Sequence, residues 1–187
     1  WMRRRWPVRS RPRRIARTVA SATIDVLDVP ATCVMLWNED RSALFVAGRS
    51  GWPLETARFI DEYESSAEAV DRLFAQFAGD ASIVVPIPDT TAAHPDDPML
   101  AELARLGVAA LAIAPIQARQ GELYGLAVVT LDALDPTEAR RVGDGLVAVA
   151  DQAAVALQNA ALVEQIRHQA AHGVGSRIGG DDSALAA

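Results

Sequence analysis

The residue types that most often carry out chemistry are scarce in this chain. Cys33 is the only cysteine, which excludes a disulfide framework and any zinc site built on two or more thiolates. A single thiol also cannot both attack and resolve in a redox cycle. Because Cys33 lies in the apolar stretch TCVMLW, we interpret it as a small buried hydrophobic residue.

The three histidines do not form a recognisable catalytic or metal-binding motif. His94 lies in the polar segment DTTAAHPDD, where it could contact a ligand or solvent. His168 and His172 are four residues apart on a predicted helix, but without an HExxH pattern we interpret them as a surface pair. The sequence shows no glycine-rich phosphate loop and no evident nucleophile–base pair. We therefore expect no metal site, no catalytic residues and no enzymatic activity.

Charge is distributed unevenly along the 187 residues. Residues 1–17 contain eight of the 18 arginines and no acid, whereas the rest of the chain is strongly acidic and the whole has a net charge of −6. An acidic body repels phosphate backbones, so we do not expect nucleic-acid contact beyond what the arginine-rich arm could make. No apolar run approaches the ~20 residues that a membrane span needs, and no apolar segment follows the arm as in a secretory signal. We expect a cytoplasmic protein.

The hydrophobic pattern predicts helices and antiparallel hairpins in alternation. Helical spacing marks 13–27, 66–77 and 98–106, while strands are expected at 32–37, 43–49, 82–87, 108–116 and 123–131. Asp135, Pro136 and Glu138 stand at the cap, first and third positions of a final helix of about 37 residues. Hairpins with segregated helices indicate an α+β fold.

The final helix carries a heptad-like series of apolar residues. At 1.5 Å per residue it would be about 55 Å long, more than the body of a domain of this size, so that it must project or pair. We expect one face to pack on the sheet and the distal part to pair with a second subunit. The predicted seam consists of Val142, Leu146, Val149, Ala153, Ala156, Ala160 and Val163.

Residues 13 to 172 resemble a GAF domain. The resemblance is strongest in IARTVASATIDVLDVPATCVMLWNED, in the segment from VPIPDTT to LYGLAVVTL, and in the helix ARRVGDGLVAVADQAAVALQNAALVEQI. It implies a PAS-like, six-stranded antiparallel sheet with the first and last helices on one face, and a small-molecule pocket on the other. It also implies a sensory or regulatory module, a homodimer, and an output domain in cis.

The resemblance further implies which residues would line the pocket. A bilin-attaching cysteine is expected beside the histidine near the pocket helix, but Ala93 precedes His94, so we expect no covalent bilin. A small molecule or a cyclic nucleotide stays possible, as does a pocket filled by its own side chains. The expected ligand-contacting residues are Trp37, Leu44, Pro88, Thr90, Thr91, His94, Leu100, Leu103, Ile113 and Val129.

The end of the chain resembles another signalling module. Residues 164–172 (EQIRHQAAH) are similar to the linker that opens a GGDEF, or diguanylate cyclase, domain. Gly179, Gly180, Asp181 and Asp182 resemble its signature, but the residues between linker and signature are missing. We expect a basic arm at 1–12, the GAF domain at 13–163, a signalling-helix extension at 164–172 and a tail with a GGDEF-like remnant at 173–187.

Two functions therefore stay open at this point. The first is a small-molecule sensor that transmits its ligand state through a dimeric terminal helix, in a protein of cyclic-di-GMP signalling. The second is a ligand-free dimerisation scaffold. A GAF-type enzyme is disfavoured, because a sulfoxide reductase needs further cysteines and a cyclase needs the missing length.

Overall fold

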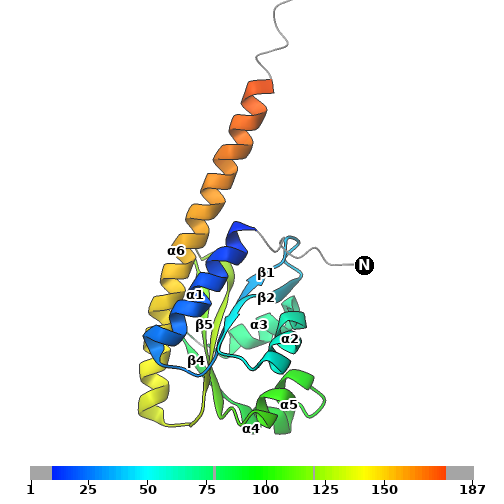
Figure 1. The fold of residues 1–187 in the computed structure, drawn as a ribbon, viewed down its shortest axis with the longest axis vertical. Helices are drawn as coiled ribbons and strands as arrows, with labels where there is room; N and C mark the ends of the chain where they lie inside the picture. The colour runs from blue at the N-terminus through cyan, green and yellow to red at the C-terminus, as the bar shows by residue number, and fades with distance from the viewer. Residues whose placement is uncertain (1–9, 78, 120, 176–187) are drawn as a thin grey trace, which may run out of the picture.

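The computed structural model of the chain describes residues 10–77, 79–119 and 121–175, without the side chains of residues 168 and 171–175. An antiparallel sheet has the strand order β3-β2-β1-β6-β5-β4. Two helices, α1 and α6, lie side by side on one face of this sheet, and shorter helices lie on the other (Figure 1). The predicted α+β fold with six antiparallel strands is confirmed.

The helices and strands follow the chain in the order helix, hairpin, short elements, hairpin, long helix. Their bounds are α1 (Arg11–Leu27), β1 (Thr32–Trp37), β2 (Ala43–Ser50), α2 (Leu54–Glu62), β3 (Glu64–Ser66), α3 (Ala67–Ala75), β4 (Ile83–Pro86), α4 (Ile87–Ala93), α5 (Pro98–Arg105), β5 (Ala110–Gln117), β6 (Leu123–Leu131) and α6 (Pro136–Gly175).

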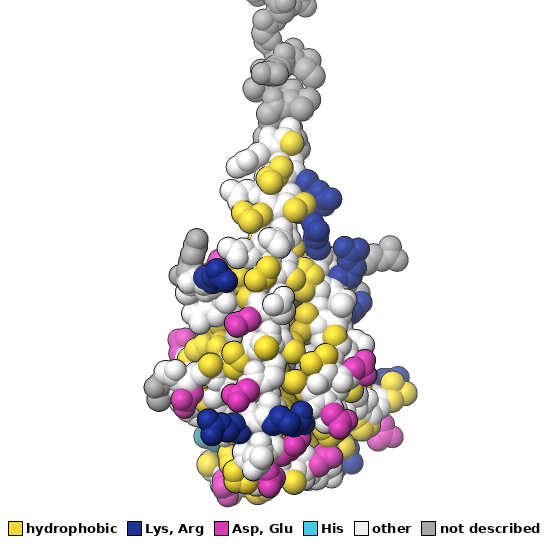
Figure 2. All heavy atoms as spheres, turned by 90° about the vertical axis from the view of Figure 1, so that its left-hand side faces the viewer, with side chains coloured by type: hydrophobic (Ala, Val, Ile, Leu, Met, Phe, Trp, Pro, Cys, Tyr) yellow, Lys and Arg dark blue, Asp and Glu magenta, His cyan; other side chains and the backbone are white. Residues whose placement is uncertain are grey.

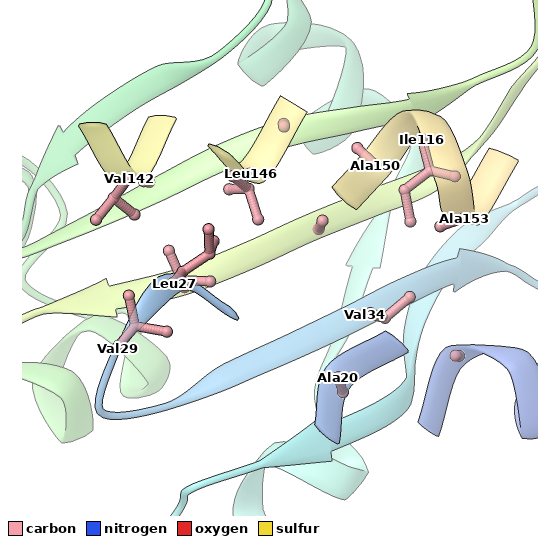
Figure 3. Packing of buried hydrophobic residues seen from close by; sticks show 14 of the residues in the cluster. Ala20, Leu27, Val29, Val34, Ile116, Val142, Leu146, Ala150 and Ala153 are labelled. Carbon is pink, nitrogen blue, oxygen red and sulfur yellow. The ribbon is translucent and has the colours of Figure 1, made fainter. Parts of the chain in front are cut away.

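The main core lies between the sheet and the pair α1 and α6. Ala112 and Ala114 of β5 are fully buried and face α6. They belong to the same core cluster as Ala150 and Ala153 of that helix. Small side chains on both elements let the helix approach the sheet closely, which explains how a chain with few aromatic residues builds a dense core. Figure 3 shows Leu146, Ala150 and Ala153 of α6 in one layer with residues of α1 and the strands.

Three elements were not predicted. Residues 54–62 form α2, the three-residue β3 extends the sheet beyond β2, and α4 replaces the first part of the predicted loop 89–97. Helix α4 forms because Ile87 is fully buried at its start and Thr90 donates a hydrogen bond to the Pro86 carbonyl at 2.6 Å. Tertiary anchoring of this kind overrides a polar local sequence.

Helix α6 is long and apolar enough between Pro136 and Arg167 to cross a membrane by length and composition, with a mean hydropathy of 1.5 over an 18-residue stretch. That is weak evidence for a span, because the core helix of a soluble domain passes the same test. Here Val142 and Leu146 are fully buried against the domain's own sheet. The core thus explains part of the apolar character of the helix, because 33% of its most apolar 18-residue stretch is buried.

Candidate ligand groove and projecting helix

The face of the sheet opposite α1 and α6 carries the strand residues expected to line a pocket. Leu44 and Ile113 lie there in a second cluster of buried side chains, and Trp37 is half-buried at its edge. Leu44 is fully buried, and Ile60, Val70 and other helix residues pack in the same cluster. The structure thus brings these residues together. Neighbouring side chains pack against them in the same cluster.

Val129 does not belong to this face, and its assignment to the pocket is corrected. Along β6, Ala127, Val129 and Leu131 point to the α1 and α6 side, whereas Leu126 and Val128 point to the opposite side. Because side chains alternate along a strand, an assignment that is wrong by one residue changes the face. Val128 occupies the position that was assigned to Val129.

The remaining predicted pocket residues lie on and around α4 and α5. Leu103 is buried in a third cluster with Ile87, and Leu100 packs against that cluster. Thr91 donates a long hydrogen bond, 3.5 Å, to the Leu100 carbonyl, and Thr90 is bonded to its own helix. Two further predicted residues, Pro88 and His94, are exposed.

A hydrogen bond network holds α5 to α2 on this side of the domain. The buried Thr56 hydroxyl donates to Glu102 at 2.7 Å, and Arg105 donates two hydrogen bonds to the same carboxylate. These bonds, the one from Arg105 first, lower the pKa of Glu102 to about 2. The carboxylate therefore stays ionised, and the contact between the two helices persists, throughout the physiological pH range.

A groove of about 630 Å³ lies at the other end of the domain, where α6 leaves the body. Its walls come from the start of α1, from the β1–β2 and β5–β6 turns and from α6. Trp37, Tyr124 and Leu157 contribute apolar and aromatic surface, and Ala160 and Ala161 form the α6 wall. Trp37 is the predicted ligand residue that lines this groove.

Arg41 fixes the two turns that border the groove. It occupies a left-handed backbone conformation, with φ of 56°, and donates hydrogen bonds to Glu122 at 3.0 Å and to the Leu123 carbonyl at 2.6 Å. The turn itself is held by Asn38, whose side-chain oxygen accepts a hydrogen bond from the Ser42 amide at 2.9 Å. Arg41 thus connects the β1–β2 turn to the β5–β6 turn, and both turns form one wall of the groove.

Tyr124 adds a polar group to that wall. The pKa of its phenol is raised first by burial and then by the negative charge of Glu122. The hydroxyl also donates a hydrogen bond to that carboxylate, which raises the pKa further. The phenol is therefore neutral at physiological pH and can donate a hydrogen bond.

The predicted dimer seam on α6 is corrected at the four members that are buried. Four of them are buried in the domain's own core and cannot contact a second subunit: Val142, Leu146, Ala153 and Ala160. The other three are half-buried: Val149, Ala156 and Val163. The four buried residues lie on the core face of the helix, which the sheet and α1 cover, whereas pairing through the three half-buried residues stays a prediction.

A different apolar stripe is exposed on the opposite side of α6. Val155, Leu162 and Ile166 are 51%, 50% and 63% exposed. Figure 2 shows hydrophobic side chains running up this side of the molecule onto the projecting part of the helix. In the sequence this stripe is a second apolar series with spacings of seven and four, and it is sparser than the series that forms the core face.

The remaining candidates for chemistry do not assemble. Cys33 is buried as predicted, and burial raises the pKa of its thiol to about 12. Among the described residues, no group of three or more His, Cys, Asp or Glu side chains could hold a metal ion. The side chains of His168 and His172, most of the basic arm and the GGDEF-like remnant at 179–182 lie outside the described residues.

Comparisons with known proteins agree with this architecture. The GAF domain family model matches residues 11–157. Among solved structures, a GAF domain/HD domain protein from Geobacter sulfurreducens has a TM-score of 0.59 and 13% identity, over 81% of this chain and 94% of that chain. The search of curated proteins gave no match.

Two further structures show the same fold. The blue-light absorbing form of the Thermosynechococcus elongatus PixJ GAF domain has a TM-score of 0.57 and 17% identity, over 86% of this chain and 93% of that chain. Residues 122 to 287 of a methyl-accepting chemotaxis protein have a TM-score of 0.57 and 19% identity, over 81% and 92%. With the family model covering most of the chain, these comparisons establish that the protein belongs to the GAF domain family.

Proposed function

We propose that this GAF domain is a regulatory sensor that binds a small molecule and transmits its ligand state through α6 in a homodimer. The observation that carries the proposal is the double role of α6. Its inner face is core up to Ala160, whereas its outer face exposes Val155, Leu162 and Ile166, and its backbone continues to Gly175. A helix that is part of the core and extends past it can carry a change from the body to whatever follows.

The outer face of α6 has the spacing of a two-helix interface. Val155 and Leu162 are seven residues apart, Ile166 follows four residues later, and Asn159 falls between them in the alternating three–four pattern. Such a pattern pairs helices side by side, and a polar residue at one core position sets the register. Because the sheet fixes the rotation of α6, the outer stripe is the side that a partner helix can reach.

The output is proposed from sequence resemblance. Residues 164–172 are similar to the linker that precedes a GGDEF domain, and Gly179 to Asp182 to its signature. On this basis we place the domain in a protein of cyclic-di-GMP signalling, with the output domain in cis and no catalysis by the GAF domain itself. The ligand of the sensor is a small molecule, of which a cyclic nucleotide is one candidate.

A ligand-free dimerisation scaffold is the second candidate, and one observation favours it. The strand residues expected to contact a ligand opposite α6 are closely packed, with Leu44 fully buried and Ile113 5% exposed. A sensor whose pocket is on this face would have to open it. Native mass spectrometry of freshly purified protein separates the two functions, because a sensor carries or accepts a discrete ligand mass and a scaffold stays bare.

The dimer is tested by light scattering coupled to size exclusion at tens of micromolar. We expect twice the chain mass of 19.9 kDa for the wild type and the monomer mass for Leu162→Glu, because a buried charge without a partner opposes pairing. Gln165→Glu is the matched control, since Gln165 is exposed on another side of α6. A monomeric wild type, or a dimeric Leu162→Glu, contradicts the proposed interface.

A further inference from the structure

The first half of α1 presents a row of arginines to solvent. Arg11, Arg14 and Arg17 follow one another at intervals of three residues and are all exposed, so they share one side of the helix. Within the described residues, none of these three forms a salt bridge with a carboxylate. Arg13 differs, because its guanidinium lies over the Phe45 ring, 4.9 Å from the centroid, and holds α1 to the sheet. We call Arg11, Arg14 and Arg17 the arginine face.

The chain around the arginine face is basic, whereas the rest of the chain is acidic. Residues 1–9 add four more arginines, and no acidic residue occurs before Asp25. Residues 18–187 hold ten arginines and all 24 acidic residues. Figure 2 shows basic side chains gathered on one side of the molecule beside α6, while most acidic side chains in this view lie towards the end where α6 begins. An anionic partner is therefore attracted to the start of α1 and repelled by the rest of the body.

The arginines at the start of α1 do not stabilise the helix itself. Positive side chains in a first helical turn oppose the helix dipole. The first turn of α1 contains no acidic residue, and the N-cap residue Ser10 makes no side-chain capping hydrogen bond. Arg11 and Arg14 thus cost the isolated helix stability, and an anionic partner would offset this cost.

The position of α1 in the fold favours a flat partner. The helix packs closely on β2, where Gly48 meets the backbone of Ala16, and it lies beside α6 (Figure 1). Its exposed side is therefore a shallow surface between neighbouring elements. A DNA major groove, about 12 Å wide, admits a whole helix, but α6 prevents α1 from entering one. A bilayer surface requires no such entry.

The composition of the preceding residues favours the same partner. Residues 1–9 contain Trp1 and Trp6 in addition to their four arginines, so that two of the four tryptophans of the chain stand within six residues. Tryptophan concentrates at the interface between a membrane and water, and arginine is attracted to anionic lipid headgroups. A segment that combines the two types is typical of proteins that bind at a bilayer surface.

We propose that the arginine face of α1, together with the arginine-rich residues before it, docks this domain on the surface of an anionic lipid bilayer. The inference goes beyond the proposed sensor function, because docking requires neither a ligand nor a dimer. Each arginine near an anionic bilayer strengthens binding about fivefold, so the three arginines of the face together contribute about a hundredfold.

The test is sedimentation of the full chain with lipid vesicles. One set is phosphatidylcholine alone, and the other contains about a third of anionic phosphatidylserine. We expect binding to the anionic vesicles only, weakened at least tenfold between about 0.1 M and about 0.5 M salt, because salt screens charges that face water. Equal binding to the neutral vesicles, or binding that salt does not weaken, overturns the proposal.

A short DNA duplex at the same concentration of anionic charge serves as the competitor. We expect the protein to stay on the anionic vesicles. A duplex that removes it would assign the arginine face to nucleic acid and overturn the bilayer proposal.

A triple variant and a matched control locate the binding. The variant carries Arg11→Gln, Arg14→Gln and Arg17→Gln, and we expect it to bind anionic vesicles about a hundredfold more weakly. Its urea midpoint should equal or exceed that of the wild type, because the substitutions remove charges that oppose the helix dipole. The control removes the same net charge from exposed positions on other elements and should bind as the wild type does; it carries Arg58→Gln, Arg72→Gln and Arg140→Gln.

Two results would overturn the assignment to the arginine face. Unchanged binding by the triple variant would mean that residues 1–9 bind without the face. An equal loss of binding in the control would mean that net charge alone, and not the position of the arginines, governs the attraction.

Discussion

At the scale of single residues, Cys33 shows what burial does to a reactive group. The thiol is 8% exposed, and desolvation raises its pKa from 9.0 to about 12. In the unfolded chain the thiol ionises near its ordinary pKa of 9.0. Between that pH and about 12 the folded chain therefore holds a proton on Cys33 that the unfolded chain has lost. The stability that depends on this proton is present below the unfolded pKa and is lost as the pH rises towards 12.

We therefore expect the free energy of unfolding to fall between about pH 9 and about pH 11, and Cys33→Ala to reduce that fall. Urea titrations of both proteins at several pH values measure it. The pKa of Tyr63 is raised first by burial and in small part by Cys33, so the difference between the two proteins reports the thiol together with this coupling. An identical pH dependence in the two would show that the thiol is accessible to water in the fold.

Two glycines give opposite expectations for the same substitution. A Cβ at Gly48 would lie 2.4 Å from the backbone of Ala16 in α1, and neither backbone can move away. Gly48→Ala should destabilise the domain by about 1–3 kcal/mol or more, as overpacking does. At Gly143 in α6 the nearest atom is the Ser82 hydroxyl, at 2.9 Å, which can rotate. Because alanine is the better helix former, Gly143→Ala should stabilise by up to about 1 kcal/mol.

The urea midpoints of the two glycine variants test this pair. A loss of stability in Gly143→Ala would mean that Ser82 is held in place, and a neutral Gly48→Ala would mean that α1 lies farther from β2 than the structure places it. Circular dichroism of both variants at low urea confirms that each comparison starts from the native fold.

At the scale of elements, the start of α6 is an example of structure fixed by local sequence. The side chain of Asp135 accepts a hydrogen bond from the Glu138 amide at 2.8 Å. Asp135→Ala should cost about 1 kcal/mol, the usual value of an N-cap, and Asp135→Asn much less. Thermal unfolding measures both, with Asp132→Ala as a control at an exposed position outside the helix. Equal stability of Asp135→Ala and the wild type would show that the first turn is held by packing alone.

The elements differ in how far the sequence could predict them. The start of α6 was predictable because Asp135, Pro136 and Glu138 act locally, and the two hairpins because their strands are separated by polar turns. Helix α4 was not, because the burial of Ile87 that anchors it depends on residues distant in the sequence. Val129 was placed on the wrong face because an apolar strand buried on both sides has no alternation to read.

At the scale of the whole molecule, the site could be predicted less well than the fold. Helix α6 has apolar residues on two opposite faces, and only the position of the sheet decides which is core and which is free. The groove was missed for a related reason. Its walls, from Arg11, Trp37, Tyr124 and Ala161, are brought together by four different elements, and no spacing along the chain records that.

The division of α6 into a core part and a projecting part leads to a prediction for the whole chain. The last buried side chain of the helix is Ala160, and the described residues beyond Val163 are exposed. A chain that ends at Val163 should therefore unfold at nearly the same urea midpoint as the full chain, since it loses almost no buried apolar surface. It should also dimerise more weakly, because it lacks Ile166 while keeping Val155 and Leu162. Sedimentation at several concentrations, beside a chain that ends at Gly175, measures the second effect. A large loss of stability on truncation would instead make the projecting part an element of the domain itself, and would remove the basis for treating it as a separate signalling extension.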